Sequence, residues 1–339
     1  MADESTRDRC AAYNVFKKQF LEMREKHKAL NEVIWQADTI HGKACTDEER
    51  REVQTVFYRS AIVSVLATWE AYVQDLFVEV RDIVVASIKR DDPSKLSDKG
   101  YEMVKKAIEH KQRSNPEMPL VDLCMKLIRN PEHWKELLDI YMQYKLDAAL
   151  RVTPVFHGSS GIDKKFQDLF TTDHTLSCTI MERNLSHSFR DKTNVEVILT
   201  SPEALNDLIQ LYYGARCVFA HGQPDRTLGP GGVLHKFPEE TELTKKVGVK
   251  SVACRLSTLY QNLQNYGRYA WVYYPTLINI QRFIIYLACR LFQAVSQCIY
   301  KEFGLEIWGF ASRSVSDSEQ DEEESELHSL FEVESDDDS

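Results

Sequence analysis

Residues 60 to 76 read Ser-Ala-Ile-Val-Ser-Val-Leu-Ala-Thr-Trp-Glu-Ala-Tyr-Val-Gln-Asp-Leu, and this stretch decides the fold class. Its apolar residues recur every three or four positions, and the repeat continues for two more turns. The apolar stripe consists of Ile62, Leu66, Trp69, Val73, Leu76, Val80 and Ile83. Upstream, Thr46-Asp-Glu-Glu49 has the form of a capping box, which marks the start of a helix. The pattern predicts one long core helix.

A flank of this expected helix carries small residues that would let another helix approach closely. They are Ser60, Ser64, Ala67 and Ala71. Glu70 lies between the apolar stripe and this flank, where a carboxylate is partly shielded from water and favours a cationic partner. Arg216 is the candidate partner. The alternative is that Glu70 faces solvent or caps a tertiary contact.

A second helix is predicted over residues 201–221. Ser201-Pro202-Glu203 supplies an N-cap, a proline for the first turn and an acid that favours the helix dipole. Apolar residues follow with a period close to 3.6, and Gly222 and Pro224 end the helix. They are Leu205, Leu208, Ile209, Tyr212, Tyr213, Cys217 and Ala220. The pattern predicts an amphipathic helix that buries one face.

The last turns of this helix carry Arg216 and, five residues later, His221. A neutral imidazole can take the proton from a 2′-hydroxyl, and a guanidinium can hold the attacked phosphate. About two such arginine and histidine pairs are expected by chance. The other one, Arg151 with His157, spans Pro154 and reads as a loop. A step of five residues turns about 140° around a helix, so the side chains of Arg216 and His221 point in different directions. They can meet only through the long reach of Arg216 or through fraying of the last turn.

These residues resemble the Arg-x4–6-His signature of the HEPN superfamily, whose all-helical domains include many RNA-cleaving enzymes. Residues 60–76 look like the first core helix of its RiboL-PSP-HEPN branch, and Gly161-Ile-Asp-Lys-Lys-Phe-Gln-Asp-Leu-Phe170 looks like its middle segment. Order and spacing agree across about residues 50–225. The family often has Asn, Asp or His directly after the arginine, whereas this chain has Cys217.

The resemblance implies a metal-independent endoribonuclease that cleaves RNA by attack of the 2′-hydroxyl, in defence or RNA surveillance. His221 would be the general base or acid, Arg216 would hold the phosphate, and Glu70 would orient Arg216. It also implies RNA as partner and a homodimer, in which two facing pairs supply both acid and base. No cofactor or metal is expected. The alternative is a non-catalytic HEPN-like module that binds RNA or protein, which Cys217 favours.

Composition is typical of a folded all-α protein. The 339 residues are 43% hydrophobic, with 10 Pro and 13 Gly, and alternation typical of a strand is confined to residues 194–199. A further helix start is Asn130-Pro131-Glu132. We expect a helical extension at 1–45, a HEPN-like core at 46–225, a loop and C-terminal helical extension at 226–311, and a disordered acidic tail at 312–339.

Cysteine usage and hydropathy bear on the compartment. The eight cysteines form no Cys-x-x-Cys pair or metal-ligand cluster, and no apolar leader begins the chain. This favours the cytoplasm, with the nucleus as the alternative, and thiols that are mostly buried. Residues 271–292 are apolar, but Arg282 and Arg290 argue against a membrane span. We expect a buried or dimer-forming helix with an ordinary solvated basic edge.

The C-terminal segment is strongly acidic, unlike the rest of the chain. Residues 317–339 carry 12 acids and no Lys or Arg, whereas the rest of the chain has 42 basic and 40 acidic residues. The whole chain is −10, so the acidic segment masks a nearly neutral body. This segment would bind basic protein partners, or compete with RNA and damp activity. The alternative is a solubilising tail without a regulatory role.

Overall fold

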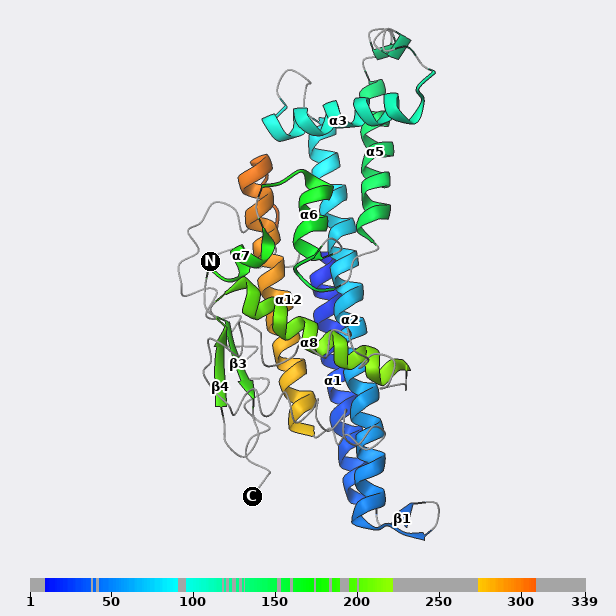
Figure 1. Cartoon of the computed structure of the whole chain (residues 1–339), viewed down its shortest axis with the longest axis vertical. Coiled ribbons are helices and arrows are strands. Elements are labelled where there is room, and N and C mark those ends of the chain that lie inside the picture. Colours follow the sequence, from blue (N-terminus) through cyan, green and yellow to red (C-terminus); the bar gives the residue numbers. More distant parts are fainter. Residues whose placement is uncertain are drawn as a thin grey trace, which may run out of the picture. The chain divides into compact units, whose positions relative to one another are not determined.

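Helices dominate the computed structural model of the chain (Figure 1). It describes residues 10–37, 39–40, 43–90, 96–117, 119, 122–123, 126–127, 130, 132–150, 154–158, 161–173, 175–182, 185–189, 195–199, 201–221 and 274–308. The longer elements are α1 (Ala11–Gln36), α2 (Asp47–Arg90), α3 (Asp98–Ser114), α5 (His133–Ala149), α6 (Ile162–Phe170), α7 (Leu176–Ile180), α8 (Pro202–His221) and α12 (Tyr274–Phe303). The expected all-α class is confirmed. The acidic tail and residues 226–273 of the expected loop and C-terminal extension lie outside the described residues.

Two short antiparallel strand pairs accompany the helices. The strands are β1 (Thr39–Ile40), β2 (Lys43–Ala44), β3 (Leu185–Phe189) and β4 (Val195–Leu199). In the second pair Leu185 lies opposite Leu199, and Phe189 lies opposite Val195. Strand β4 coincides with the one stretch whose alternation predicted a strand, whereas β3 was not predicted.

The chain divides into two compact units. Unit 1 takes residues 1–14, 72–179 and 291–319, and unit 2 takes residues 15–71, 180–290 and 320–339. Helices α1, α2 and α12 each contribute residues to both. The predicted site residues Glu70, Arg216 and His221 all belong to unit 2.

Helix α2 begins as the capping box predicts. The Thr46 N–H donates to Glu49 Oε2 at 2.9 Å, and the Glu49 N–H donates to Thr46 Oγ1 at 3.2 Å. The predicted apolar stripe is buried from Ile62 to Val80. Ile83 is the exception, because Val84 takes the core position one turn after Val80 and leaves Ile83 half-buried.

Unit 2 is a bundle of α1, α2, α8 and α12. Helix α1 runs antiparallel to α2, since Ser64 Oγ contacts Met23 Sδ and Tyr58 donates to Asn31. Helix α12 reaches α1 through the amide of Gln281, whose Nε2 lies 2.9 Å from His27 Nδ1. It reaches α8 through Phe283, whose ring lies 5.8 Å from that of Tyr212. Helix α8 thus contacts α12 through Tyr212 and α2 through Arg216.

Most described residues of helix α12 are buried, including Arg282 of its basic edge, whereas Arg290 is half-buried. Arg282 is only 8% exposed, so the expectation of an ordinary solvated edge is wrong there. The aliphatic stem of an arginine packs readily against apolar neighbours, which a helical repeat does not reveal. Among the described helices, α2 and Leu277–Phe303 are long and apolar enough to cross a membrane. Half of the apolar window in α2 and 78% of that in α12 are buried inside the protein.

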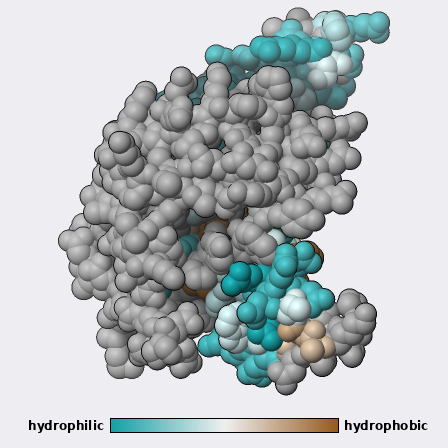
Figure 2. All heavy atoms as spheres, turned by 60° about the horizontal axis from the view of Figure 1, so that its bottom comes forward, coloured by the Kyte–Doolittle hydropathy of each residue, from teal (hydrophilic) through white to brown (hydrophobic). Residues whose placement is uncertain are grey.

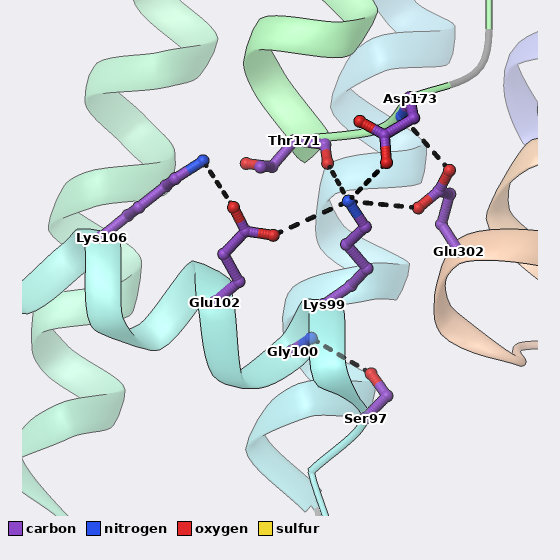
Figure 3. A network of polar contacts seen from close by, with 8 residues as sticks. All are labelled: Ser97, Lys99, Gly100, Glu102, Lys106, Thr171, Asp173 and Glu302. Carbon is purple, nitrogen blue, oxygen red and sulfur yellow. Dashed lines mark hydrogen bonds and ion pairs between the residues drawn. The ribbon is translucent and has the colours of Figure 1, made fainter.

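In unit 1 a network of charges ties the start of α3 to distant segments (Figure 3). The Lys99 ammonium donates to the Thr171 carbonyl at 2.9 Å and pairs with Asp173, Glu302 and Glu102 at 3.3 to 3.7 Å. Desolvation lowers the pKa of Lys99, but the hydrogen bond that Lys99 donates to Asp173 and the charges of the three carboxylates outweigh it and raise the pKa. This lysine therefore stays charged and links α3, the α6–α7 connection and α12.

The described surface at the α1–α2 connection is mainly hydrophilic, with a small hydrophobic area (Figure 2). Large apolar side chains that are exposed in unit 2 are Val15, Leu30, Val33, Trp35, Val53 and Val56. Single exposed apolar residues of this kind are common on soluble proteins and carry no functional assignment by themselves.

Candidate active site

Helix α8 is built as the sequence predicts at its start. Ser201 Oγ accepts the Ala204 N–H at 3.2 Å, and the Ser201 carbonyl accepts the Leu205 N–H at 3.1 Å. Pro202 follows as the first helical residue, where its missing N–H costs nothing. The N-terminus of α8 is therefore fixed by local interactions.

Among the side chains of α8 that the structure describes, Tyr212 is the last that is buried. Leu205, Leu208, Ile209 and Tyr212 are all buried, and burial raises the pKa of the Tyr212 hydroxyl. Beyond them Tyr213 is half-buried and Ala220 is exposed, so the prediction that both belong to the core face is wrong. Of the other described side chains in the last two turns, Arg216 and Phe219 are half-buried, so water reaches each of them.

The predicted pair of Glu70 and Arg216 forms. Arg216 Nη1 lies 2.7 Å from Glu70 Oε2, and the two side chains are 22% and 26% exposed. Helix α8 crosses α2 at this point (Figure 1). A single short contact leaves other guanidinium N–H groups able to donate elsewhere, because the group has five donors. The carboxylate fixes the orientation of a cation that stays open to solvent.

An aromatic ring supports the same guanidinium. Arg216 Cζ lies 5.3 Å from the ring centroid of Tyr213, three residues earlier on α8. The ring and the carboxylate together restrict the rotamers of Arg216, which lowers the entropy lost on binding an anion. Tyr213 was predicted as a core residue, so its role here was missed.

Helix α8 continues to His221, its last residue. The sequence placed the histidine in the final turn, and the backbone agrees. The position of its imidazole lies outside the described side chains, as does that of Cys217, so convergence of Arg216 and His221 stays a prediction.

A second arginine lies at this crossing of helices. Arg59 of α2 has its guanidinium carbon 5.6 Å from the ring centroid of Phe219, which lies between Arg216 and His221 on α8. Sequence reasoning missed Arg59. The available signal was its spacing of 11 residues from Glu70, which places both on nearly the same line along a helix.

Other constellations are separate from this site. His157 Nε2 lies 3.8 Å from Asp163 Oδ2 in unit 1, and the chain around it is irregular, as predicted for the second arginine and histidine pair. Asp163 accepts from the Ser177 N–H at 2.8 Å and from the Ser177 hydroxyl, so it caps α7. Burial raises the pKa of Asp163. Because Ser177 donates to the carboxylate rather than to the imidazole, the three do not form a nucleophilic triad.

A cleft of about 790 Å³ also lies in unit 1, between α2 and α5. It contains Arg81 and Lys89, but also Asp82, Asp139 and Asp147. These charges are already engaged, since Arg81 pairs with Asp82 and Lys89 with Asp139. No group of three or more potential metal ligands occurs among the described residues.

Comparisons with family models, with curated proteins and with solved structures returned no match. The candidate site accordingly rests on its own geometry and on the resemblance of its motif.

Proposed function

We propose that this protein is a metal-independent endoribonuclease of the HEPN type, with Arg216, His221 and Glu70 as its site. The observation that carries the proposal is the 2.7 Å pair of Arg216 with Glu70. A guanidinium held by a carboxylate, yet still 22% exposed, suits an anion that arrives from solvent. Surface ion pairs are common, so the position beside the end of α8 gives this one its weight.

In the proposed reaction the 2′-oxygen of a ribose attacks the adjacent phosphorus. His221 takes the proton of the 2′-hydroxyl, and the bond from phosphorus to the 5′-oxygen breaks. The 5′-oxygen leaves with a proton from an acid, which in a homodimer is the His221 of the partner subunit. Arg216 stabilises the negative charge on the phosphate oxygens. The products are a 2′,3′-cyclic phosphate and a 5′-hydroxyl.

Cleavage of RNA in the presence of EDTA tests the proposal. Purified full-length protein is incubated with single-stranded and structured RNA, beside His221→Ala and Arg216→Ala. We expect wild-type cleavage with cyclic phosphate ends, and a loss of at least about 100-fold in each variant. Exposed residues of α2 offer matched controls, and Arg51→Ala should cleave like the wild type. Cleavage that persists in His221→Ala would contradict the assignment.

A second candidate is a non-catalytic HEPN-like module that binds RNA or protein. Cys217 favours it, because the family often has a polar residue directly after the arginine. RNA binding that is lost in Arg216→Ala, without cleavage by the wild type, would support this module. Its partners would be RNA or basic proteins, and its compartment the cytoplasm or the nucleus.

A further inference from the structure

A cluster of lysines lies where α3, α5 and α6 pack together in unit 1. Helix α5 contacts both of the other helices and carries Lys145. The charge of Lys145 interacts with those of Lys106 on α3 and of Lys164 and Lys165 on α6. All four residues belong to unit 1. The Lys145 ammonium is therefore close enough to three others to be repelled by them.

Carboxylates neutralise only part of this cluster. Two of the four lysines have a carboxylate partner at 3.0 Å, and these pairs are Lys106 with Glu102 and Lys164 with Asp168. Among the described residues, neither Lys145 nor Lys165 forms an ion pair. The cluster thus presents two ammonium groups that the described part of unit 1 leaves without a carboxylate partner.

The surroundings of Lys145 make its positive charge costly. Its side chain is half-buried, and Nζ lies 5.6 Å from the ring centroid of Tyr141, one turn earlier on α5. Burial is the largest cause that lowers the pKa of Lys145, and Asp168 opposes it. The charges of the other three lysines lower this pKa further. A methionine would pack its stem against the same ring without these costs, so packing alone is a weak reason for a lysine.

An exposed aromatic ring adjoins the cluster. Tyr144 of α5 is 54% exposed and stacks on His110 of α3, with ring centroids 4.4 Å apart. The His110 ring also lies 5.6 Å from the ring of Tyr141, over which Lys145 lies. Tyr144 is thus held on one side and open to solvent on another. Such a ring is a stacking surface for a nucleobase.

We propose that this cluster binds a single-stranded nucleic acid, with Lys145 and Lys165 on its phosphates and Tyr144 stacked on a base. Phosphate oxygens accept hydrogen bonds from the two ammonium groups and relieve their repulsion. The anchored ring favours a single strand over a phosphorylated peptide, because a single strand offers bases next to its phosphates. This surface lies in unit 1 and does not depend on the Arg216 and His221 site of unit 2.

An oligonucleotide that cannot be cleaved tests the proposal. Full-length wild type, Lys145→Met, Lys165→Met and Lys126→Met are titrated with a labelled single-stranded 2′-O-methyl RNA at several salt concentrations. A methylated 2′-oxygen cannot attack phosphorus, so binding is measured without cleavage. For Lys145→Met and Lys165→Met we expect a Kd about three- to tenfold weaker and a salt slope smaller by about 0.7. Lys126 is exposed and outside the cluster, so Lys126→Met should match the wild type.

Two further variants separate charge, stacking and folding. Tyr144→Leu should weaken the Kd about five- to tenfold without changing the salt slope, because it removes the ring and no charge. Lys145→Arg should keep the slope. Lys145→Met should melt at or above the temperature of the wild type, because it removes a desolvated charge. If it melts earlier, the comparison of Lys165→Met with Lys126→Met decides.

Equal affinities and salt slopes for the variants at 145, 165 and 126 would overturn the proposal. A wild type that binds an acidic phosphorylated peptide but no oligonucleotide would also overturn it. The proposed function is judged separately, by cleavage of unmodified RNA in the Arg216→Ala and His221→Ala variants. Cleavage that is lost in those variants, with Lys145→Met binding like the wild type, would leave the proposed function standing and remove this surface.

Discussion

The carboxylate of Glu70 restricts the orientation of the Arg216 guanidinium. Glu70 was expected to want a cationic partner because of its place beside the apolar stripe, and the pair forms at 2.7 Å. At about a quarter exposed, such a pair adds little to stability, on the order of 1 kcal/mol or less. Its effect is on orientation, since it removes rotamers that Arg216 would otherwise sample.

Substitution Glu70→Gln should therefore affect activity more than stability. We expect kcat for RNA cleavage to fall about tenfold, because a loosely held guanidinium loses its alignment with the phosphate. The melting temperature should change by no more than a few degrees. Cleavage kinetics and thermal unfolding measure the two, with the exposed Glu52→Gln on the same helix as control. Glu70→Asp should recover part of the rate, and equal rates for both glutamine variants would contradict the positioning role.

Glu79 in unit 1 stabilises the fold, whereas Glu70 mainly orients another side chain. Its carboxylate accepts the Ala11 and Ala12 N–H groups at 3.0 and 2.7 Å and the Trp308 indole N–H at 3.1 Å. The first turn of α1 contains no acid of its own, so an acid from α2 caps it. Three donors that are otherwise short of acceptors thus depend on one side chain.

Loss of this carboxylate should destabilise the protein. Glu79→Ala is expected to lower the free energy of unfolding by about 2 to 4 kcal/mol, because hydrogen bonds to a charged acceptor are worth more than neutral ones. Urea unfolding measures the change, and the exposed Glu32→Ala on α1 controls for the charge. A change below about 1 kcal/mol would show that water replaces the carboxylate without loss.

At the scale of elements, local sequence patterns correctly predicted where helices α2, α5 and α8 begin. The capping box of α2 and the Ser201 cap of α8 form as expected, because they involve residues only three positions apart. Helix α5 begins just after the predicted start at Asn130-Pro131-Glu132, and it buries large apolar residues. They are Trp134, Leu137, Leu138, Tyr141 and Leu146.

The features that could not be predicted from the sequence depend on contacts with residues far away along the chain. Tyr212 packs against Phe283 of α12, whereas Tyr213 is half-buried and Ala220 is exposed, so these last two were assigned to the core in error. Arg59 was missed for the same reason, since its ring partner lies 160 positions away. The strand β3 has no marked pattern of its own and depends on pairing with β4. Apolar periodicity predicts which face of a helix is apolar, but it does not predict which element packs against that face or how far along the helix.

The contact between α1 and α12 should make unit 2 sensitive to acid. Burial lowers the pKa of His27 below its usual 6.5, and its Nδ1 lies 2.9 Å from the Gln281 amide. The folded state therefore disfavours protonation of His27. Its stability contribution is present above pH 6.5 and is lost as the pH falls below 6.5 toward the lower folded pKa.

Urea unfolding at pH 8 and pH 5 tests this dependence. The wild type should lose stability at pH 5, and His27→Gln, which cannot be protonated, should lose less. His133→Gln is a suitable control, because His133 is half-buried beside the exposed Glu136. If His27→Gln and the wild type lose equal stability between the two pH values, another group is responsible for the acid sensitivity.

At the scale of the whole molecule, the distribution of charge bears on RNA binding. The 12 acids of residues 317–339 turn a body with 42 basic and 40 acidic residues into a chain of −10. If the protein binds RNA as proposed, this polyanionic segment would compete for the same cations at a high effective concentration, because it is tethered. In the proposed site, the Arg216 guanidinium is a cation for which this segment and RNA would compete.

Removal of residues 313–339 should then raise RNA affinity. We expect a Kd at least about threefold tighter at 50 mM salt, and a smaller gain at 300 mM, because screening weakens the competition. A full-length variant with the acids of 317–339 changed to Asn and Gln separates charge from length and should match the truncation. Fluorescence anisotropy with a labelled RNA measures all three proteins. Equal affinities at 50 mM salt would mean that the segment acts only on solubility, and a gain in the truncation alone would point to steric exclusion rather than charge.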